Sequence, residues 1–325
     1  MIVVTGGAGF IGSAFVWKLN QEGIEDIVIV DRLGTSEKWK NLVGLRYTDY
    51  LHRDAFGEMA TRDAVPFEVS AIIHMGACSS TTERDADFLW TNNFAYTRTL
   101  AEWALKHAVR FIYASSAATY GDGTQGFSDL HDKIASLKPI NMYGYSKQVF
   151  DLWVLRNRLE YKVTGIKFFN VFGPNEYHKG DMSSVIFKSF HQIRQTGKVQ
   201  LFKSYLPEYQ DGGQMRDFVY VKDCVNVMWW LLQNPGTNGI FNLGTGKART
   251  WNDLIGAVYA AMDLKTRIEY MDMPASLRSQ YQYFTQADMT KLKQTGCPAA
   301  FSSLEDSVRD YVVNYLQKAD PHLGI

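Results

Sequence analysis

The sequence lacks an excess of charge, a set of paired cysteines and any long apolar run. Lys plus Arg and Asp plus Glu number 34 each, so no basic field is expected to attract nucleic acid or a membrane surface. Three cysteines, at 78, 224 and 297, are too few and too far apart for a disulfide framework, which indicates a reducing compartment. No segment reads as a membrane span or a secretion signal. We therefore expect a cytoplasmic protein whose partners are small molecules or copies of itself.

Short apolar runs alternate with segments of helical length through the first half of the chain. Runs that are apolar on both faces are typical of strands buried in a parallel sheet between two layers of helices. The alternative is the same alternation without this topology. With right-handed crossovers, the pattern predicts an α/β fold with a doubly wound parallel Rossmann sheet. The predicted strands are 1–5, 26–31, 69–74, 110–115 and 162–169, and the predicted helices are 11–22, 84–107 and 145–160.

After Gly173 and Pro174, this alternation of strands and helices gives way to loops and shorter helices. The later runs FVYV (218–221) and FNLGTG (241–246) are predicted to be strands that return to the sheet. We therefore expect a dinucleotide-binding domain over 1–170, joined by 215–243, and a smaller α/β substrate-binding domain. That second domain would consist of 171–214 and 244–325.

The first strand runs into TGGAGFIGS, which contains Gly6, Gly7, Gly9 and Gly12. Glycines at this spacing allow a tight turn, a close approach of backbone to a pyrophosphate, and close packing of helix on sheet. The start of the helix then offers free N–H groups to the anion. An ordinary flexible turn is the alternative, but Asp31 ends the second strand at the distance expected of a ribose-binding carboxylate. The sequence therefore predicts a dinucleotide site.

The choice of dinucleotide depends on charges around the adenosine ribose. Asp31 alone favours NAD, because its charge repels a 2′-phosphate. Arg32, Lys38 and Arg53 could hold such a phosphate, although all three could equally lie on a solvated surface. NADP is the favoured cofactor, with NAD possible, and no metal site is expected.

NMYGYSK places Tyr143 and Lys147 four residues apart, on one face of a helix. A tyrosine phenol titrates near about 10 unless a cation stabilises its phenolate, so Lys147 and an oxidised nicotinamide are expected to lower its pKa. The phenolate could then take a hydroxyl proton while hydride leaves the same carbon. Ser116 follows a strand at the ligand-binding edge and could bond the reacting oxygen. A surface tyrosine on a helix is the plainer alternative.

Together these motifs resemble the extended short-chain dehydrogenase/reductase family, which acts on nucleotide-activated sugars. The resemblance covers nearly the whole chain and is carried by TGGAGFIG, IIHMGA (72–77), YASSAATYG (113–121), YGYSK, FFNVFGP and RDFVYVKD. Within the family, the chain is most similar to the epimerases of ADP-heptose, which serve lipopolysaccharide biosynthesis. The segments that carry this closer likeness are GACSSTTE (76–83), YASSAATYG, NVFGPNEYHKG (170–180) and YFTQAD (283–288).

The resemblance implies roles for particular residues. Expected cofactor contacts are Gly6, Gly9, Phe10, Ile11, Gly12, Asp31, Arg32, Lys38, Arg53, Met75, Gly76, Ala77, Cys78, Ser79, Asn92, Lys147, Val171 and Lys179. Expected substrate contacts are Asn170, Asp181, Lys188, Phe202, Lys203, Ser204, Tyr205, Arg216 and Tyr281. Arg216 suits a diphosphate because of its planar fork, or it forms a structural ion pair with Asp217. The chain departs from the family pattern at Met75, Asp181, Lys188 and the longer loop 205–214.

The implied reaction inverts C6 of the heptose in ADP-D-glycero-β-D-manno-heptose. A carbon bearing a hydroxyl without an adjacent carbonyl has no acidic C–H, so inversion needs transient oxidation to a ketone and reduction on the other face. Each orientation of the carbonyl needs its own proton donor or acceptor. The resemblance implies Tyr143 and Lys179 as these two groups, with Ser116 and Lys147 assisting. From composition alone, Lys179 reads as a solvated loop lysine.

Other functions remain open from sequence. A UDP-hexose 4-epimerase shares the glycine loop, the serine and the Tyr-Lys pair, but gives no reason for HKG at 178–180. A dehydratase is disfavoured because Ala117 and Ala118 follow Ser116 where that family pattern has Asp and Glu. A third possibility is a scaffold that binds NADP without turnover. The resemblance also implies a homo-oligomer, a pentamer in the family.

Overall fold

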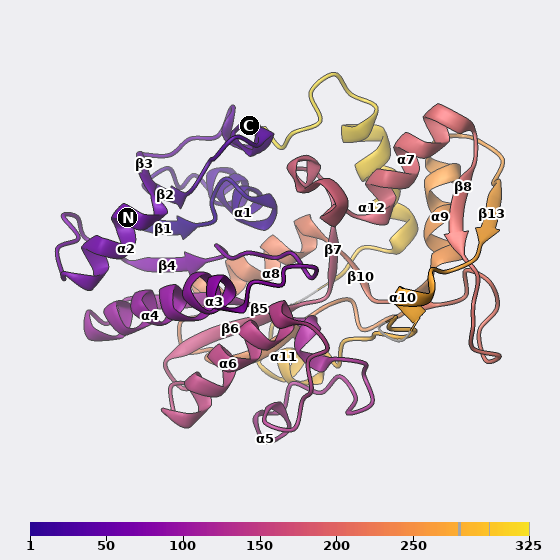
Figure 1. Ribbon diagram of the computed structural model, residues 1–325. Coiled ribbons are helices and arrows are strands. Elements are labelled where there is room, and N and C mark those ends of the chain that lie inside the picture. Colours follow the sequence, from indigo (N-terminus) through magenta and orange to yellow (C-terminus); the bar gives the residue numbers. More distant parts are fainter. Residues whose placement is uncertain (279–280, 299, 325) are drawn as a thin grey trace.

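A computed structural model describes residues 1–278, 281–298 and 300–324. Its centre is a seven-stranded sheet with the order β11-β6-β5-β4-β1-β2-β3 (Figure 1). All neighbouring strands in it run parallel. The strands are β1 (Ile2–Thr5), β2 (Ile27–Asp31), β3 (Asp49–His52), β4 (Ala71–His74), β5 (Arg110–Ser116), β6 (Val163–Phe168) and β11 (Gly239–Leu243). The chain order reverses between β1 and β4, which places a crevice at their carboxyl ends.

Helices cover both faces of this sheet, so the predicted doubly wound fold is confirmed. Side chains alternate along β1: Ile2 and Val4 belong to one core cluster, and Val3 belongs to the other. The first cluster is covered by α1 (Phe10–Gln21) and α8 (Val221–Gln233). The second is covered by α2 (Arg53–Thr61), α4 (Tyr96–Lys106) and α6 (Met142–Arg156).

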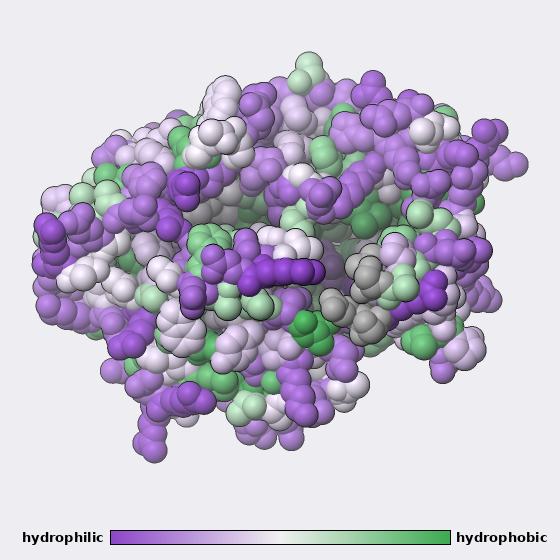
Figure 2. Space-filling view, in the orientation of Figure 1, coloured by the Kyte–Doolittle hydropathy of each residue, from purple (hydrophilic) through white to green (hydrophobic). Residues whose placement is uncertain are grey.

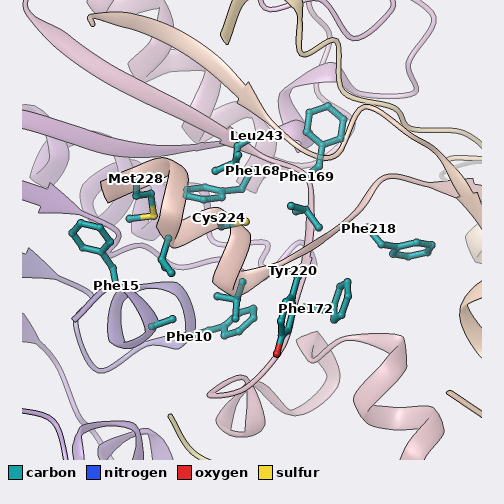
Figure 3. Packing of buried hydrophobic residues seen from close by; sticks show 14 of the residues in the cluster. Phe10, Phe15, Phe168, Phe169, Phe172, Phe218, Tyr220, Cys224, Met228 and Leu243 are labelled. Atoms are coloured by element: carbon teal, nitrogen blue, oxygen red, sulfur yellow. The ribbon is translucent and has the colours of Figure 1, made fainter. Parts of the chain in front are cut away.

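Helix α8 shares a core with α1, although it comes far later in the chain. Met228 and Cys224 of α8 are fully buried and lie near Phe15 of α1 and Phe168 of β6 (Figure 3). Fully burying an apolar side chain of this size contributes about 1.5–3 kcal/mol. This shared core fixes α8 on the same face of the sheet as α1.

The later part of the chain adds three two-stranded sheets and further helices, which lie mainly to the right in Figure 1. The paired strands are β7 (Asn170–Phe172) with β10 (Phe218–Tyr220), β8 (Val199–Phe202) with β13 (Ile268–Met271), and β9 (Met215–Arg216) with β12 (Arg249–Thr250). The helices are α7 (Val185–Thr196), α9 (Trp251–Ala261), α10 (Ala275–Arg278), α11 (Thr290–Gln294) and α12 (Leu304–Tyr311). No helix within the described ranges combines the length and apolarity that a membrane crossing requires.

The structure corrects three predictions of local structure. Strand β10 pairs with β7 and not with the seven-stranded sheet, so of the two late runs only the one at 239–243 joins it. Edge strand β3 was not predicted, because its half-exposed DYLH lacks an apolar run. The helix predicted at 84–107 is divided into α3 (Ala86–Leu89), a π-helical turn (Trp90–Ala95) and α4.

A fully buried ion pair ties three elements together beneath the carboxyl edge of the sheet. Lys167 of β6 donates to the Asp151 carboxylate of α6 at 2.5 Å, and both side chains are 0% exposed. Asp151 also accepts from the hydroxyls of Tyr113 at 2.9 Å and Ser115 at 2.7 Å, both on β5. Lys167 further donates to Thr119 Oγ1 at 2.9 Å. The pair thus holds β5, β6 and α6 in one register.

We expect Lys167→Met to lower the free energy of unfolding by about 3–5 kcal/mol, because it leaves the Asp151 charge buried without its partner. Adding Asp151→Asn removes that charge and should restore a substantial part of the loss. Urea unfolding measures both variants. Lys198→Met is the matched control, since Lys198 forms an exposed pair with Glu269 at 2.7 Å and should change stability by at most about 1 kcal/mol. Equal losses in the buried and exposed variants would contradict the expectation.

Strand β4 ends in a histidine that is enclosed by two threonines. His74 is 1% exposed, with Nδ1 2.6 Å from Thr5 Oγ1 and Nε2 2.8 Å from Thr97 Oγ1. Burial lowers its pKa to about 3, with a smaller contribution from Lys147. The imidazole is therefore neutral at neutral pH and links the sheet to α4.

The buried histidine makes stability depend on pH. Between its unfolded pKa near about 6.5 and its folded pKa of about 3, the unfolded chain binds the extra proton. The free energy of unfolding should therefore fall as pH falls from about 6.5 toward 3. Urea unfolding at several pH values measures the slope, and His74→Gln should flatten it. An unchanged slope in that variant would show that other groups cause the dependence.

Candidate active site

The glycine loop brings three backbone segments together at the start of α1. Gly6 has φ +64°, and a Cβ there would lie 2.6 Å from the backbone nitrogen of Gly76. A Cβ on Gly12 would overlap the carbonyl oxygen of Gly6. Helix α1 begins at Phe10, and its N-cap residue Gly9 supplies no side-chain cap. The first N–H groups of the helix are thus available to an anion such as a pyrophosphate.

Two adjoining cavities of about 450 and 200 Å³ run along the carboxyl edge of the sheet, and the face drawn in Figure 2 is hollowed near its centre. Every residue expected to contact the cofactor lines one of them. The larger is lined by Gly6, Gly9, Phe10, Ile11, Gly12, Asp31, Lys38, Met75, Gly76, Ala77, Ser79, Lys147, Val171 and Lys179. Arg32, Arg53, Cys78 and Asn92 line the smaller. An extended cavity beside an uncapped helix start fits a dinucleotide.

The two adjoining cavities are called the cofactor channel below. At one end of this channel, Asp31 is surrounded by hydrogen-bond donors. Its Oδ2 accepts from the backbone N–H of Ala8 at 2.9 Å, and its Oδ1 accepts from Lys38 Nζ and Arg32 N, each at 2.6 Å. Lys38 is therefore ion-paired, not merely solvated. Arg53 bonds Asp54 at 2.8 Å and lies over the ring of Tyr96. A carboxylate neutralised in this way repels a nearby phosphate less.

At the other end lie the tyrosine, lysine and serine. Asn141 caps α6 by accepting from Gly144 N at 2.7 Å, which places Tyr143 and Lys147 on the first turns. Both line the larger cavity, as does Ser116 at the end of β5. Lys147 Nζ donates to the carbonyl of Ala114 at 2.8 Å, and burial lowers its pKa to about 8.

The electrostatics of Tyr143 differ from expectation. Burial raises the pKa of its phenol, and a hydrogen bond with Ser116 opposes that rise. Among the chain's own groups, desolvation has the largest influence, so the pKa of the phenol is raised overall and not lowered as expected. Ser116 is the protein group that favours the phenolate.

Lys179 lines the same cavity from another element, the short 3-10 helix η4 (Tyr177–Met182). Its ammonium lies 5.3 Å from the ring centroid of Phe10. Burial lowers its pKa, and the buried carboxylate of Glu176 opposes this. Lys179 is thus a half-buried residue of the cavity lining and not a fully solvated loop lysine.

The loop before Lys179 is pinned from several sides. Asn175 donates to Ser13 Oγ at 2.9 Å and accepts from Leu323 N at 2.9 Å. Tyr177 donates its hydroxyl proton to the carbonyl of Pro321 at 2.6 Å. These contacts hold the loop that carries Lys179 against α1 and against residues 321–323.

A third cavity, of about 760 Å³, lies between α7, β8 and α9. Of the residues expected to contact substrate, Asp181, Lys188, Phe202 and Tyr281 line it, together with Trp251. Arg216 lies within 6 Å of the ring centroids of Trp251 (5.7 Å) and Tyr281 (5.5 Å) and donates to the carbonyls of Met215 and Gln282. Its suggested ion pair with Asp217 is wrong, because that carboxylate accepts from Thr245, Gly246 and Ala287.

Five expected substrate residues are not among the described residues that line these three cavities: Asn170, Lys203, Ser204, Tyr205 and Arg216. Lys203 pairs with Asp272 at 3.1 Å, and the Tyr205 hydroxyl accepts from Arg278 at 2.8 Å. Lys188 donates to the backbone carbonyl of Asp181 at 2.5 Å, and no described contact joins Asp181 to Lys179.

His178 and Trp251 are among the cavity-lining residues that sequence reasoning missed. His178 lines the larger cavity beside Lys179, and its only signal was its place in HKG. Trp251 lines the third cavity, and it is the first residue of α9, inside the Thr250–Asp253 capping box that marks the start of this helix.

Comparisons with known proteins agree with this geometry. The family model described as the NAD dependent epimerase/dehydratase family matches residues 2–244. A protein of Nitratidesulfovibrio vulgaris (strain Hildenborough) named ADP-L-glycero-D-manno-heptose-6-epimerase is 64% identical, covering 99% of this chain and 100% of its own length. A protein of the same name from Fusobacterium nucleatum is 48% identical, with the same two coverages.

A solved structure agrees with the whole fold. The Helicobacter pylori ADP-L-glycero-D-manno-heptose-6-epimerase is 25% identical and superimposes with a TM-score of 0.81, covering 96% of this chain and 95% of the other. From the matched family model and these full-length relatives, the chain belongs to the NAD dependent epimerase/dehydratase family.

Proposed function

We propose that this protein is an epimerase that converts ADP-D-glycero-β-D-manno-heptose to ADP-L-glycero-β-D-manno-heptose by inverting C6. The full-length relatives that share 64% and 48% of its residues carry the name of that enzyme. The observation that carries the proposal is that Tyr143, on α6, and Lys179, on η4, both line one cavity. Two proton-transfer groups on different elements suit a carbonyl that must be served in two orientations.

The cavity residues have distinct tasks in this proposal. A bound nicotinamide dinucleotide supplies a reversible hydride acceptor, held by the glycine loop, Asp31 and Lys147. In one direction of the reaction, Tyr143 takes the hydroxyl proton of one epimer, and once the ketone has turned over, Lys179 donates a proton to its oxygen as the other epimer forms. In the reverse direction the two groups exchange these roles, and both recover their protonation states by proton exchange with solvent. Ser116 bonds the Tyr143 phenol and so favours its deprotonated form.

The substrate is proposed to extend into the third cavity. Residues 1–170, with 215–243, would bind the dinucleotide, and 171–214 with 244–325 would bind the sugar nucleotide. Arg216 is held by two backbone carbonyls, so its remaining N–H groups keep a fixed direction for a diphosphate. A homo-oligomer, a pentamer by family resemblance, and a cytoplasmic location belong to the same proposal.

Removing either proton-transfer group should slow epimerisation while the fold and bound cofactor remain. Tyr143→Phe and Lys179→Met should each lower kcat by about 10²–10⁴-fold, the usual contribution of a positioned acid or base. Conversion of ADP-heptose without added cofactor is the assay. Tyr145→Phe is the matched control, because Tyr145 lies on the same helix and is 56% exposed. Normal turnover by Lys179→Met would exclude a two-base reaction.

The substrate assay also separates the competing functions. Turnover of a UDP-hexose but not of ADP-heptose would favour a 4-epimerase. Bound cofactor without turnover of any sugar nucleotide would favour a scaffold.

NADP is proposed as the preferred cofactor because Lys38 and Arg53 line the channel near Asp31. Lys38→Ala and Arg53→Ala should each weaken NADP binding about tenfold or more, since hydrogen bonds to charged groups contribute about 1.5–3 kcal/mol. NAD binding should change much less. Lys40→Ala is the control, because Lys40 lies on the same turn but is paired with Glu37 outside the channel. Tighter binding of NAD than NADP by the unaltered protein would overturn this preference.

A further inference from the structure

One buried amide connects the glycine loop with the loop that carries Lys179. Asn41 is 1% exposed, and its Nδ2 donates to the carbonyls of Ala8 and Asn175, each at 3.0 Å. The same nitrogen lies 3.3 Å from Nδ1 of His178. Ala8 belongs to the phosphate-binding loop, whereas Asn175 and His178 precede Lys179.

The short helix that carries Asn41 also reaches the ribose end of the channel. Asn41 lies on the 3-10 helix η1 (Glu37–Leu42), three residues after Lys38, which pairs with Asp31 at 2.6 Å. Asp31 in turn accepts from the N–H of Ala8, the residue whose carbonyl Asn41 binds. A continuous set of polar contacts therefore runs from the ribose carboxylate to the Lys179 loop.

This arrangement differs from that of the other loop contacts. Asn175 is also held by Ser13 and Leu323, but neither of these residues lines the cofactor channel. Losing the Asn41 amide would leave two backbone carbonyls short of a donor and free the loop to shift relative to the glycine loop. A displacement of about 1 Å at a catalytic group can cost about 10²-fold in rate.

We propose that Asn41 is a positioning residue that sets the Lys179 ammonium against the cofactor channel. It acts through the Asn175–His178 backbone and does not itself touch the reacting atoms. The inference rests on the proposed two-base function, and it assigns to η1 a second task besides binding the ribose end of the cofactor.

A second buried asparagine, Asn20, serves as a matched control for substitutions of Asn41. Asn20, on α1, is 2% exposed, and its Nδ2 donates to the carbonyls of Ile24 at 2.9 Å and Arg46 at 2.8 Å. It lines neither part of the channel. Asn41→Ala and Asn20→Ala should therefore both lower stability in urea, but only Asn41→Ala should lower kcat for ADP-heptose, by about tenfold or more.

A double-mutant cycle separates positioning of Lys179 from a general structural effect. In the Lys179→Met background, Asn41→Ala should cause little further loss, because the group it positions is already gone. Asn41→Ser and Asn20→Ser, which each keep one hydroxyl donor, serve as the pair if an alanine variant fails to fold. Asn41→Ser should then show the selective loss of kcat.

Each contrary result has a distinct meaning. Equal kcat for the Asn41 and Asn20 variants, with Lys179→Met slow, overturns the role of Asn41 alone. The same fold-loss from Asn41→Ala with and without Lys179 also overturns it. Normal turnover by Lys179→Met overturns the two-base function and this role together.

Discussion

The buried pair of Lys167 and Asp151 is the interaction on which the arrangement of the candidate site depends. Asp151 lies one helical turn beyond Lys147, and its carboxylate accepts from Ser115, the neighbour of Ser116. Two charges without solvent tolerate little change in geometry, since either one left alone carries a large desolvation cost. Helix α6 and the ends of β5 and β6 therefore keep one register. This register fixes the relative positions of Tyr143, Lys147 and Ser116, which lie on these elements.

Much of the seven-stranded sheet and the glycine loop was predictable because their signals are local. Runs such as IVVT and IVIVD are apolar on both faces. Gly6 and Gly12 lie where backbone segments approach so closely that a side chain would not fit. The elements that were predicted wrongly have a common physical origin, because both depend on tertiary contacts. The π-helical turn at Trp90–Ala95 is favoured by tertiary contacts, in which Asn93 bonds both backbone groups of Cys78. The partner of β10 was likewise decided by long-range pairing with β7, which no local pattern records.

The candidate site shows the same division. Tyr143, Lys147 and Ser116 follow from motif spacing, because a helix face and a strand end suffice to place them. The supports of Lys179 do not, since Asn41, Ser13 and Leu323 reach its loop from distant parts of the sequence. The pKa of Tyr143 also escaped prediction, because charge is visible in sequence and desolvation depends on the packed structure.

The contacts between the Lys179 loop and residues 321–324 also bear on the order of assembly during synthesis. Pro321 and Leu323 bind the loop, and Gly324 accepts from the indole of Trp17 on α1. A growing chain folds from its N-terminal part onward, so the glycine loop after β1 can form before residues 321–324 have been synthesised. The loop that carries Lys179 therefore gains its contacts with Pro321 and Leu323 only after the glycine loop has formed.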